Sequence, residues 1–297
     1  MMWRIAATIV LGVLLWLAFA GSHDPLLARW TMIHVNEEVP ADAHLLEITG
    51  GPTILIDTGY PTGNRLVAFL RARKIQTIDS VWITHAHRDH YGGLGLLLDA
   101  GFQIKQVRMT RPDRKVCDAE STWGCQYHEV EDVFARLVRE RIPVSAIQAG
   151  ERETWTQNAT LDTLYAFDGV HTPVGTTDIN DMSPILLLTV GGTRALFTGD
   201  LNASIGGYLA EHGKNLRAEI LKVPHHGGES VAPNAFFDQV RARTAMVPAP
   251  RSLWAGDRTQ RLKKYFAGTK TYVSGFHGHV QVLMRASGYE IVAERPL

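Results

Sequence analysis

Short apolar runs and helically spaced apolar residues alternate along the chain, as expected for a protein that mixes strands and helices. Runs rich in β-branched and aliphatic residues predict strands at Trp30–Val35, Ala43–Ile48, Thr53–Asp57, Val81–Thr84, Gln106–Met109, Ala159–Ala166, Ile185–Val190, Arg194–Thr198, Glu219–Val223, Thr244–Val247 and Val280–Met284. Apolar residues three and four apart predict helices at Asn64–Arg73, Gly93–Leu98, Val130–Arg141, Pro233–Val240 and Thr259–Phe266. Because several strands precede helices, the pattern predicts a layered α/β protein and excludes a helical bundle.

The predicted elements fall into two halves with the same order. In each half a meander of strands ends in a turn that carries an aspartate, Asp57 in the first half and Asp200 in the second. A helix, a buried strand and a histidine-containing turn then follow, at Thr84–His87 and at Val223–His226. No linker-like stretch separates the halves. Residues 21–297 are therefore predicted to form one domain built from two related units.

The N-terminus has the features of an export signal. Arg4 supplies one positive charge, Ile5–Ala20 carries no charge, and Ala18–Ala20 has the small-x-small pattern of a cleavage site. This predicts a signal peptide over residues 1–20 and a periplasmic or secreted mature protein. The alternative is an uncleaved anchor through residues 3–20, which would tether the protein to the inner membrane facing outward, because the stretch is only slightly shorter than the roughly 17–25 residues of a spanning helix.

Composition narrows the function classes. Apolar residues make up 45% of the chain and charged residues 20%, which excludes wholesale disorder. The 30 Lys and Arg balance the 30 Asp and Glu, so no global field attracts a polyanion. Two cysteines exclude a Cys-rich zinc module, and in an oxidising compartment a disulfide between Cys117 and Cys125 is favoured over two free thiols.

The strongest chemical signal follows the predicted strand Val81–Thr84. The segment His85–His90 reads His-Ala-His-Arg-Asp-His, so three imidazoles and a carboxylate lie within six residues at a strand end. His85 and His87, two apart, can face the same side of an extended turn. These donor types suit zinc, with manganese or iron as alternatives. The segment predicts a metal site.

Further donors lie in equivalent turns. Asp200 follows a predicted strand through Gly199 and is placed to bridge two metals. Asp57 ends the matching strand of the first half and is predicted to hydrogen-bond a ligand histidine. Neighbouring side chains in a turn rarely bind one ion, so one of His225 and His226 is predicted to be a ligand and the other a proton-transfer or supporting group.

These motifs resemble the metallo-β-lactamase superfamily, in order, over about residues 30–295. The matching segments are Ile54–Gly59, Thr84–Gly93, Leu196–Asp200 and Lys222–Gly227. The resemblance implies the four-layer αβ/βα sandwich with a dinuclear metal site between the two halves. The Val-Pro-His-His-Gly turn is most similar to the hydrolase domain of DNA-uptake competence proteins and to phosphorylcholine esterases. The stretch Thr271–Val292, which is predicted to end in a strand hairpin, is similar to the same subgroup.

The resemblance also implies a ligand set for two zinc ions. Site one takes His85 and His87, site two takes Asp89, His90 and His226, and Asp200 bridges the two. For the third ligand of site one the alternatives are His171 and the turn Asn180–Ser183. Two turns of the competence-like proteins are replaced here: a Gly-His-Pro turn by Trp254–Asp257, and a Gly-Gln-Gly-Asp turn by Val39–Asp42.

Two metals that share a bridging hydroxide can cleave phosphodiesters, carboxylic esters, lactones and β-lactams. The leading prediction is an exported phosphodiesterase acting on a nucleic acid or a phosphocholine-type ester. Asp89 and His225 are its predicted catalytic residues, and Lys222 and Arg88 are its predicted phosphate contacts. An acyl hydrolase of the β-lactamase or lactonase type and a non-catalytic metal-binding or sensing protein are the alternatives. The sequence indicates no protein partner.

Overall fold

The computed structural model describes residues 24–120, 124–167, 173–174 and 178–296. The predicted signal segment 1–20 and the candidate ligand His171 lie outside these residues. No helix within the described ranges is long and apolar enough to cross a membrane.

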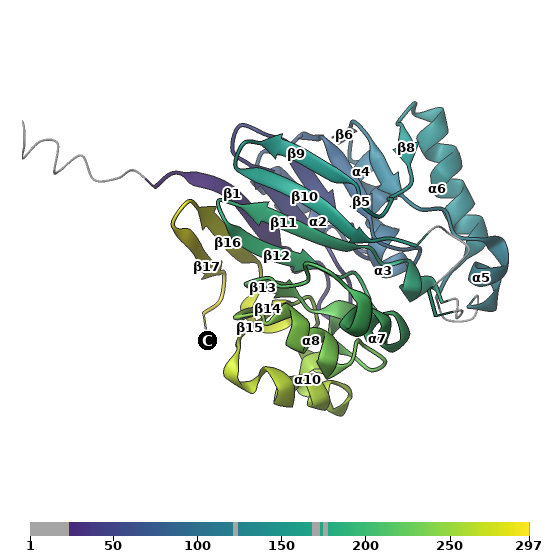
Figure 1. Ribbon diagram of the computed structural model, residues 1–297. Helices are drawn as coiled ribbons and strands as arrows, with labels where there is room; N and C mark the ends of the chain where they lie inside the picture. Colours follow the sequence, from purple (N-terminus) through teal and green to yellow (C-terminus); the bar gives the residue numbers. More distant parts are fainter. Residues whose placement is uncertain (1–23, 121–123, 168–172, 175–177, 297) are drawn as a thin grey trace, which may run out of the picture.

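Two large mixed sheets form the centre of the molecule (Figure 1). The first has the order β17-β16-β1-β2-β3-β5-β7-β8. Its strands are β1 (Leu26–Met32), β2 (His44–Ile48), β3 (Thr53–Ile56), β5 (Ser80–Ile83), β7 (Val107–Met109), β8 (Val144–Ser145), β16 (Val280–Arg285) and β17 (Gly288–Ala293). The strands from β17 to β3 pair antiparallel, and those from β3 to β8 pair parallel.

The second sheet repeats this plan in the order β15-β14-β13-β12-β11-β10-β9. Its strands are β9 (Arg152–Thr156), β10 (Ala159–Tyr165), β11 (Ile185–Val190), β12 (Thr193–Phe197), β13 (Ile220–Lys222), β14 (Thr244–Val247) and β15 (Lys270–Val273). A small ribbon pairs β4 (Thr77–Ile78) with β6 (Gln103–Ile104). An antiparallel meander therefore leads into parallel strands in both sheets, as the two-unit prediction requires.

Helices flank the two sheets (Figure 1). They are α2 (Arg65–Ala72), α3 (Arg88–Tyr91), α4 (Gly93–Asp99), α5 (Arg114–Ala119), α6 (Tyr127–Arg139), α7 (Ala203–His212), α8 (Asn234–Val240), α9 (Arg251–Ala255), α10 (Gln260–Tyr265) and α11 (Ser274–His277). Short 3-10 turns lie at η1 (Ile179–Met182), η2 (Pro224–Gly227), η3 (Asp257–Thr259) and η4 (Phe266–Gly268).

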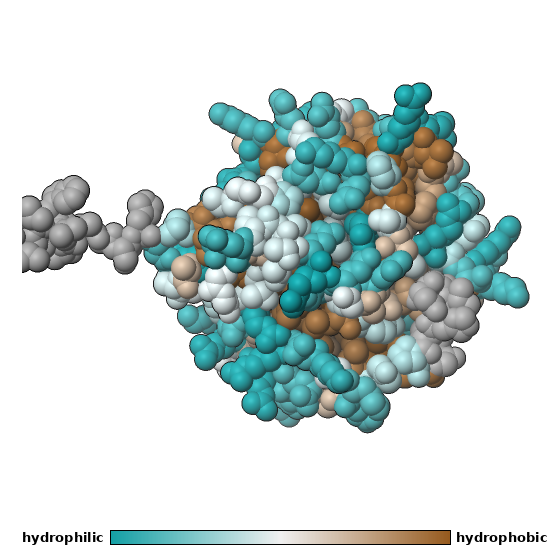
Figure 2. All heavy atoms as spheres, turned by 45° about the horizontal axis from the view of Figure 1, so that its top comes forward, coloured by the Kyte–Doolittle hydropathy of each residue, from teal (hydrophilic) through white to brown (hydrophobic). Residues whose placement is uncertain are grey.

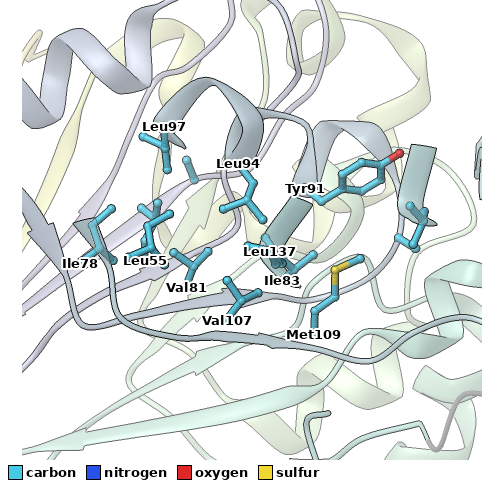
Figure 3. Close-up of a cluster of buried hydrophobic side chains, with 14 of the residues drawn as sticks. Leu55, Ile78, Val81, Ile83, Tyr91, Leu94, Leu97, Val107, Met109 and Leu137 are labelled. Atoms are coloured by element: carbon cyan, nitrogen blue, oxygen red, sulfur yellow. The ribbon is translucent and has the colours of Figure 1, made fainter. Parts of the chain in front are cut away.

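Three apolar clusters hold four layers together. Residues such as Trp30 and Trp82 of the first sheet pack against Phe197 and Met246 of the second. The opposite face of the first sheet packs on α2, α4 and α6, where Leu94 and Leu97 lie over Leu55 and Val81 (Figure 3). The second sheet packs in the same way on α7, α8 and α10. This is the predicted αβ/βα sandwich.

Burial on both faces explains why the central strands read as continuous apolar runs. In β2, Leu45 joins the cluster under the helices while the next residue, Leu46, joins the cluster between the sheets. On the outside, Figure 2 shows hydrophilic side chains interspersed with smaller apolar areas.

Two elements differ from the sequence-based prediction because contacts with distant parts of the chain determine them. The repeated order of the two halves predicts a helix after Asp200, and α7 is that helix, but its bounds could not be predicted because two glycines interrupt its apolar pattern. A Cβ at Gly206 would approach Ala232 to 2.6 Å, so this glycine allows α7 to lie close to α8. Strand β1 begins at Leu26, four residues before its predicted start, because it pairs with the distant strand β16.

The predicted bond between Cys117 and Cys125 is present. Both residues are completely buried, and the bond joins the body of α5 to the segment before α6. Two described residues between the cysteines, Glu120 and Gly124, lie next to His87.

Gly93 brings α4 into direct contact with the turn after β3. Its amide donates to the Gly59 carbonyl at 3.0 Å, and an added Cβ would collide with the Thr58 carbonyl oxygen. We expect Gly93→Ala to lower the free energy of unfolding by about 1–3 kcal/mol, as overpacking does elsewhere. The matched control is Gly95→Ala in the same helix, whose added Cβ would lie 3.7 Å from an Arg136 nitrogen and which should change stability by no more than about 1 kcal/mol. Urea denaturation measures both, and equal effects would contradict this account.

Candidate metal centre

The predicted site residues follow strands from both sheets. His85–His90 comes after β5 of the first sheet, Asp200 comes after β12 of the second, and the His225–His226 turn comes after β13. The carboxyl ends of parallel strands are the usual place for ligands in α/β folds. The site therefore lies where the two halves meet.

Four predicted ligands form one close group. Nε2 of His90 and Nε2 of His226 each lie 3.3 Å from the same oxygen, Oδ2 of Asp200. Nε2 of His226 also lies 3.1 Å from Oδ2 of Asp89. One donor atom from each of these four residues falls within 4.8 Å of the others, which suits the residues around a metal ion.

His85 and His87 form a second pair beside this group. Nε2 of His85 lies 3.1 Å from Nδ1 of His87, and the His85 ring centroid is 4.0 Å from that of His90. Two nitrogens at this separation can bind one zinc ion, because each Zn–N bond is about 2.0–2.1 Å long. The predicted site-one and site-two residues thus lie in adjoining groups.

Every one of these histidines has its other nitrogen on an oxygen. Nδ1 of His90 bonds to Asp57 at 2.8 Å, and Nδ1 of His226 bonds to the Pro248 carbonyl at 2.9 Å. Nδ1 of His85 lies 3.0 Å from the Thr84 hydroxyl, and Nε2 of His87 lies 2.9 Å from Glu120. An oxygen acceptor fixes the tautomer and leaves the opposite lone pair free for a metal.

Asp57 is the predicted partner of a ligand histidine, and it does bond His90. Its two oxygens also accept hydrogen bonds from the Thr84 amide at 2.8 Å and the Thr84 hydroxyl at 2.9 Å. The residue adopts a φ of 58° and is buried, and burial raises the pKa of its carboxyl. Asp57 therefore orients His90 from inside the protein.

The buried carboxylates of the site favour positive charge on the groups around them. Burial would lower the pKa of His226, but the carboxylates of Asp200 and Asp42 outweigh burial and hold it well above its ordinary value. The pKa of His90 is raised for the same reason, by Asp200, Asp57 and Asp89. Within the described residues, the buried Nε2 of His90 makes no hydrogen bond of normal geometry. These residues fit a divalent metal, whose binding would displace protons.

The histidine turn has an unusual backbone. His225, His226 and Gly227 have φ values of 50°, 52° and 76°, a conformation that non-glycine residues adopt only when packing enforces it. A Cβ on Gly227 would approach the Trp254 ring to 2.6 Å. Trp254, which stands in the place of the absent Gly-His-Pro turn, thus packs on the back of this turn.

Lys222 is not placed to contact a substrate phosphate, contrary to the sequence-based prediction. Its side chain is 1% exposed, and its ammonium group donates to the Gly199 carbonyl at 2.7 Å. The same group pairs with the buried carboxylate of Asp42 and lies 3.4 Å from Oδ1 of Asp200. Lys222 is therefore an internal counter-ion behind the predicted ligand Asp200.

A cavity of about 280 Å³ opens onto the ligand groups. His225 lines it together with Tyr60, Arg88 and Gln126, as do His87, Asp89, Asp200 and His226. The Arg88 guanidinium pairs with Glu129 at the rim, with Nε 2.6 Å from Oε2. Arg88 as a phosphate contact and His225 as a proton donor stay predictions, and both side chains reach the cavity.

The third site-one ligand also stays open. His171 lies outside the described residues, whereas the alternative turn, Asn180–Ser183, is described. The Ser183 hydroxyl lies 3.4 Å from Nδ1 of His85 and accepts a hydrogen bond from the Asp200 amide at 2.9 Å. This turn therefore borders both ligand groups.

Sequence reasoning missed Glu120 and did not assign Asp42 a role at the site. Glu120 was hidden because it lies 33 residues from its partner His87, in a segment without periodicity. A role for Asp42 could have been suspected from the sequence, because Asp42 stands where the Gly-Gln-Gly-Asp turn of the competence-like proteins has its aspartate.

Comparison with known proteins shows which proteins this chain resembles. A family model for the metallo-beta-lactamase superfamily matches residues 37–108, which include the His85–His90 segment. In residues 37–108 the chain is thus similar to the metallo-beta-lactamase superfamily. The ComE operon protein 3 of Bacillus subtilis (strain 168) is 25% identical over 187 residues, which are 63% of this chain and 22% of that protein. The chain thus matches about a fifth of this relative's length.

Solved structures show the same fold. The metallo-beta-lactamase fold protein YhfI from Bacillus subtilis superposes with a TM-score of 0.51 at 16% identity, covering 84% of this chain and 97% of YhfI. A diphosphatase from the PhnP family also gives a TM-score of 0.51, at 14% identity, covering 86% and 96% of the two chains. The predicted metallo-beta-lactamase superfamily resemblance and sandwich fold are confirmed.

Proposed function

We propose that this protein is a divalent-metal-dependent phosphodiesterase that acts outside the cytoplasm. The observation that carries the proposal is the position of Asp200. Its Oδ2 faces His90 and His226 at 3.3 Å each, while its Oδ1 faces Lys222. One carboxylate oxygen is thus held toward the predicted site-two ligands by a charge behind it, as a metal ligand would need.

The ligand groups offer enough donors for two metals. His85 and His87 would hold one, Asp89, His90 and His226 would hold the other, and Asp200 would serve both. The donor set of imidazoles and carboxylates favours zinc, with manganese or iron as alternatives. When bound, such ions lower the pKa of water and neutralise charge on phosphoryl oxygens.

The chain's own residues then supply orientation and a proton. Asp89 borders the cavity and is partly exposed, so it can hold a metal and the reacting water in register. His225 lines the same cavity. Burial lowers the pKa of His225, which makes its protonated imidazole a stronger acid toward a leaving alkoxide.

Two observations favour a phosphoester over an acyl substrate. An aspartate stands at position 200, where exported lactamases of the superfamily generally place cysteine or serine. A structural neighbour of the same fold is a diphosphatase from the PhnP family. A small phosphodiester and the end of a nucleic-acid strand are the two substrate classes proposed, and they are distinguished by assay.

The test is a substrate panel on protein purified without chelator. We expect close to two zinc-class ions per chain by elemental analysis, and turnover of a nitrophenyl phosphodiester or of nitrophenyl phosphorylcholine. A chelator should abolish the turnover and added Zn²⁺ or Mn²⁺ should restore it. Faster turnover of a lactone or a chromogenic cephalosporin than of both phosphodiesters would overturn the proposal. So would absence of metal after add-back.

A further inference from the structure

A hydrogen bond joins His87 to Glu120, a residue outside the segment His85–His90. Nε2 of His87 donates to Oε2 of Glu120 at 2.9 Å, and each of these side chains is 9% exposed. The other carboxylate oxygen, Oε1, accepts the Ile179 amide at 3.0 Å. Glu120 is thus anchored at both oxygens inside the protein.

This bond determines which nitrogen of His87 can bind a metal. A carboxylate that accepts from Nε2 keeps the proton there and leaves the lone pair on Nδ1. Nδ1 is the atom that lies 3.1 Å from Nε2 of His85. Without Glu120, the ring could carry its proton on Nδ1 or rotate, and site one would lose a donor.

Glu120 is held in turn by the disulfide loop. Its amide donates to the Cys117 carbonyl at 3.0 Å, and its carbonyl accepts from the Gly124 amide at 2.8 Å. Cys117 is the one fully buried residue of α5, all of which is described, and it is bonded to Cys125. A helix of six residues has little stability of its own. The disulfide is therefore a covalent attachment of the segment that carries Glu120.

Gly124 lies directly against the hydrogen-bonded side chains of His87 and Glu120. A Cβ added there would lie 2.7 Å from Nε2 of His87 and 3.1 Å from Oε2 of Glu120. Gly124 also lines the cavity beside the metal ligands. Gly124 thus packs against the His87–Glu120 bond and also borders the cavity.

We propose that Glu120 positions His87 for metal binding and that the Cys117–Cys125 disulfide holds Glu120 in place. Metal retention at the His85–His87 pair then depends on an oxidised disulfide 30 residues further along the chain. The inference rests on the metal requirement of the proposed function, but not on the substrate.

The first variant is Glu120→Gln. A carboxamide cannot accept from both His87 and Ile179, because one of its two ends is an NH₂ group. We expect the Zn²⁺ dissociation constant, measured by chelator competition, to rise by about 10–100-fold, as for other carboxylate partners of ligand histidines. The matched control is Asp118→Asn in the same helix, since Asp118 is exposed and pairs with Arg114; it should bind Zn²⁺ like the wild type.

A second readout separates positioning from general destabilisation. Nitrogen-15 NMR of the metal-free protein should show the proton of His87 on Nε2 in the wild type and in Asp118→Asn, and a growing share on Nδ1 in Glu120→Gln. Neither measurement uses a substrate, so failure of the phosphodiesterase assignment would leave this test intact. Unchanged affinity together with an unchanged tautomer in Glu120→Gln would overturn the proposal.

The disulfide is tested in two ways. A dithiol supplies two electrons and two protons, converting the bond to two thiols and itself to a cyclic disulfide, and the reduced protein should bind Zn²⁺ about 10–100-fold more weakly. Gly124→Ala keeps the disulfide but intrudes on the His87–Glu120 bond, and it should weaken Zn²⁺ binding even if the reduced protein unfolds. A reduced, folded protein that binds Zn²⁺ with wild-type affinity would overturn the role of the disulfide. Wild-type Zn²⁺ affinity in Gly124→Ala would show that contact between residue 124 and the His87–Glu120 bond does not affect metal binding.

Discussion

Asp200→Asn is expected to release both metal ions. The Asn amide can satisfy Lys222 with its oxygen only by turning its NH₂ group toward His90 and His226, where no lone pair then remains for a metal. The loss in kcat/KM should exceed the roughly 10–100-fold that follows removal of a ligand's hydrogen-bonding partner. Elemental analysis after gel filtration measures the metal, and the diester assay measures the rate.

The control for this variant is Asp162→Asn on β10, whose carboxylate pairs with Arg152 at the molecular surface. That protein should keep both ions and its full rate. Retention of one ion by Asp200→Asn would show that Asp200 is a terminal ligand of a single site, and retention of both would show that it is no ligand.

His226→Ala and His225→Ala are expected to separate metal binding from proton transfer. Nε2 of His226 faces Asp89 and Asp200, so its removal should lower metal content and activity together. His225 lines the cavity, and its removal should leave both metals in place. Turnover should then fall by about 10²–10⁴-fold for diesters with poor leaving groups, the range typical of a general acid.

The leaving group provides the diagnostic comparison. A nitrophenolate needs little protonation, so His225→Ala should slow nitrophenyl esters least and alkyl esters most. An equal loss on both would leave His225 as a positioning residue. Loss of metal with His225→Ala and retention with His226→Ala would exchange the roles of the two neighbours.

Much of the architecture could be predicted because its signals are local. Apolar runs buried on both faces marked the central strands, and β11 and β14 have the predicted bounds. The grouping of His85–His90 with Asp200 and His226 followed from motifs that each fit within six residues. The roles of these residues stay predictions until metal is measured.

What could not be predicted depends on pairs distant in the sequence. The bond from His87 to Glu120 and the ion pair from Lys222 to Asp42 join segments with no shared pattern. Lys222 shows the consequence most clearly. A lysine beside a metal motif suggests a phosphate contact, and only the fold reveals that Asp42 lies buried next to it.

The position of β1 between β2 and β16 has a consequence for the order of folding. During synthesis β1 can pair with β2 early, but its other edge lies open until Val280–Arg285 has been made. Such long-range pairing is slow to form, and an unpaired edge can recruit other chains. The first half of the sequence therefore cannot complete its own sheet, which is closed only when the distant hairpin of β16 and β17 has been made.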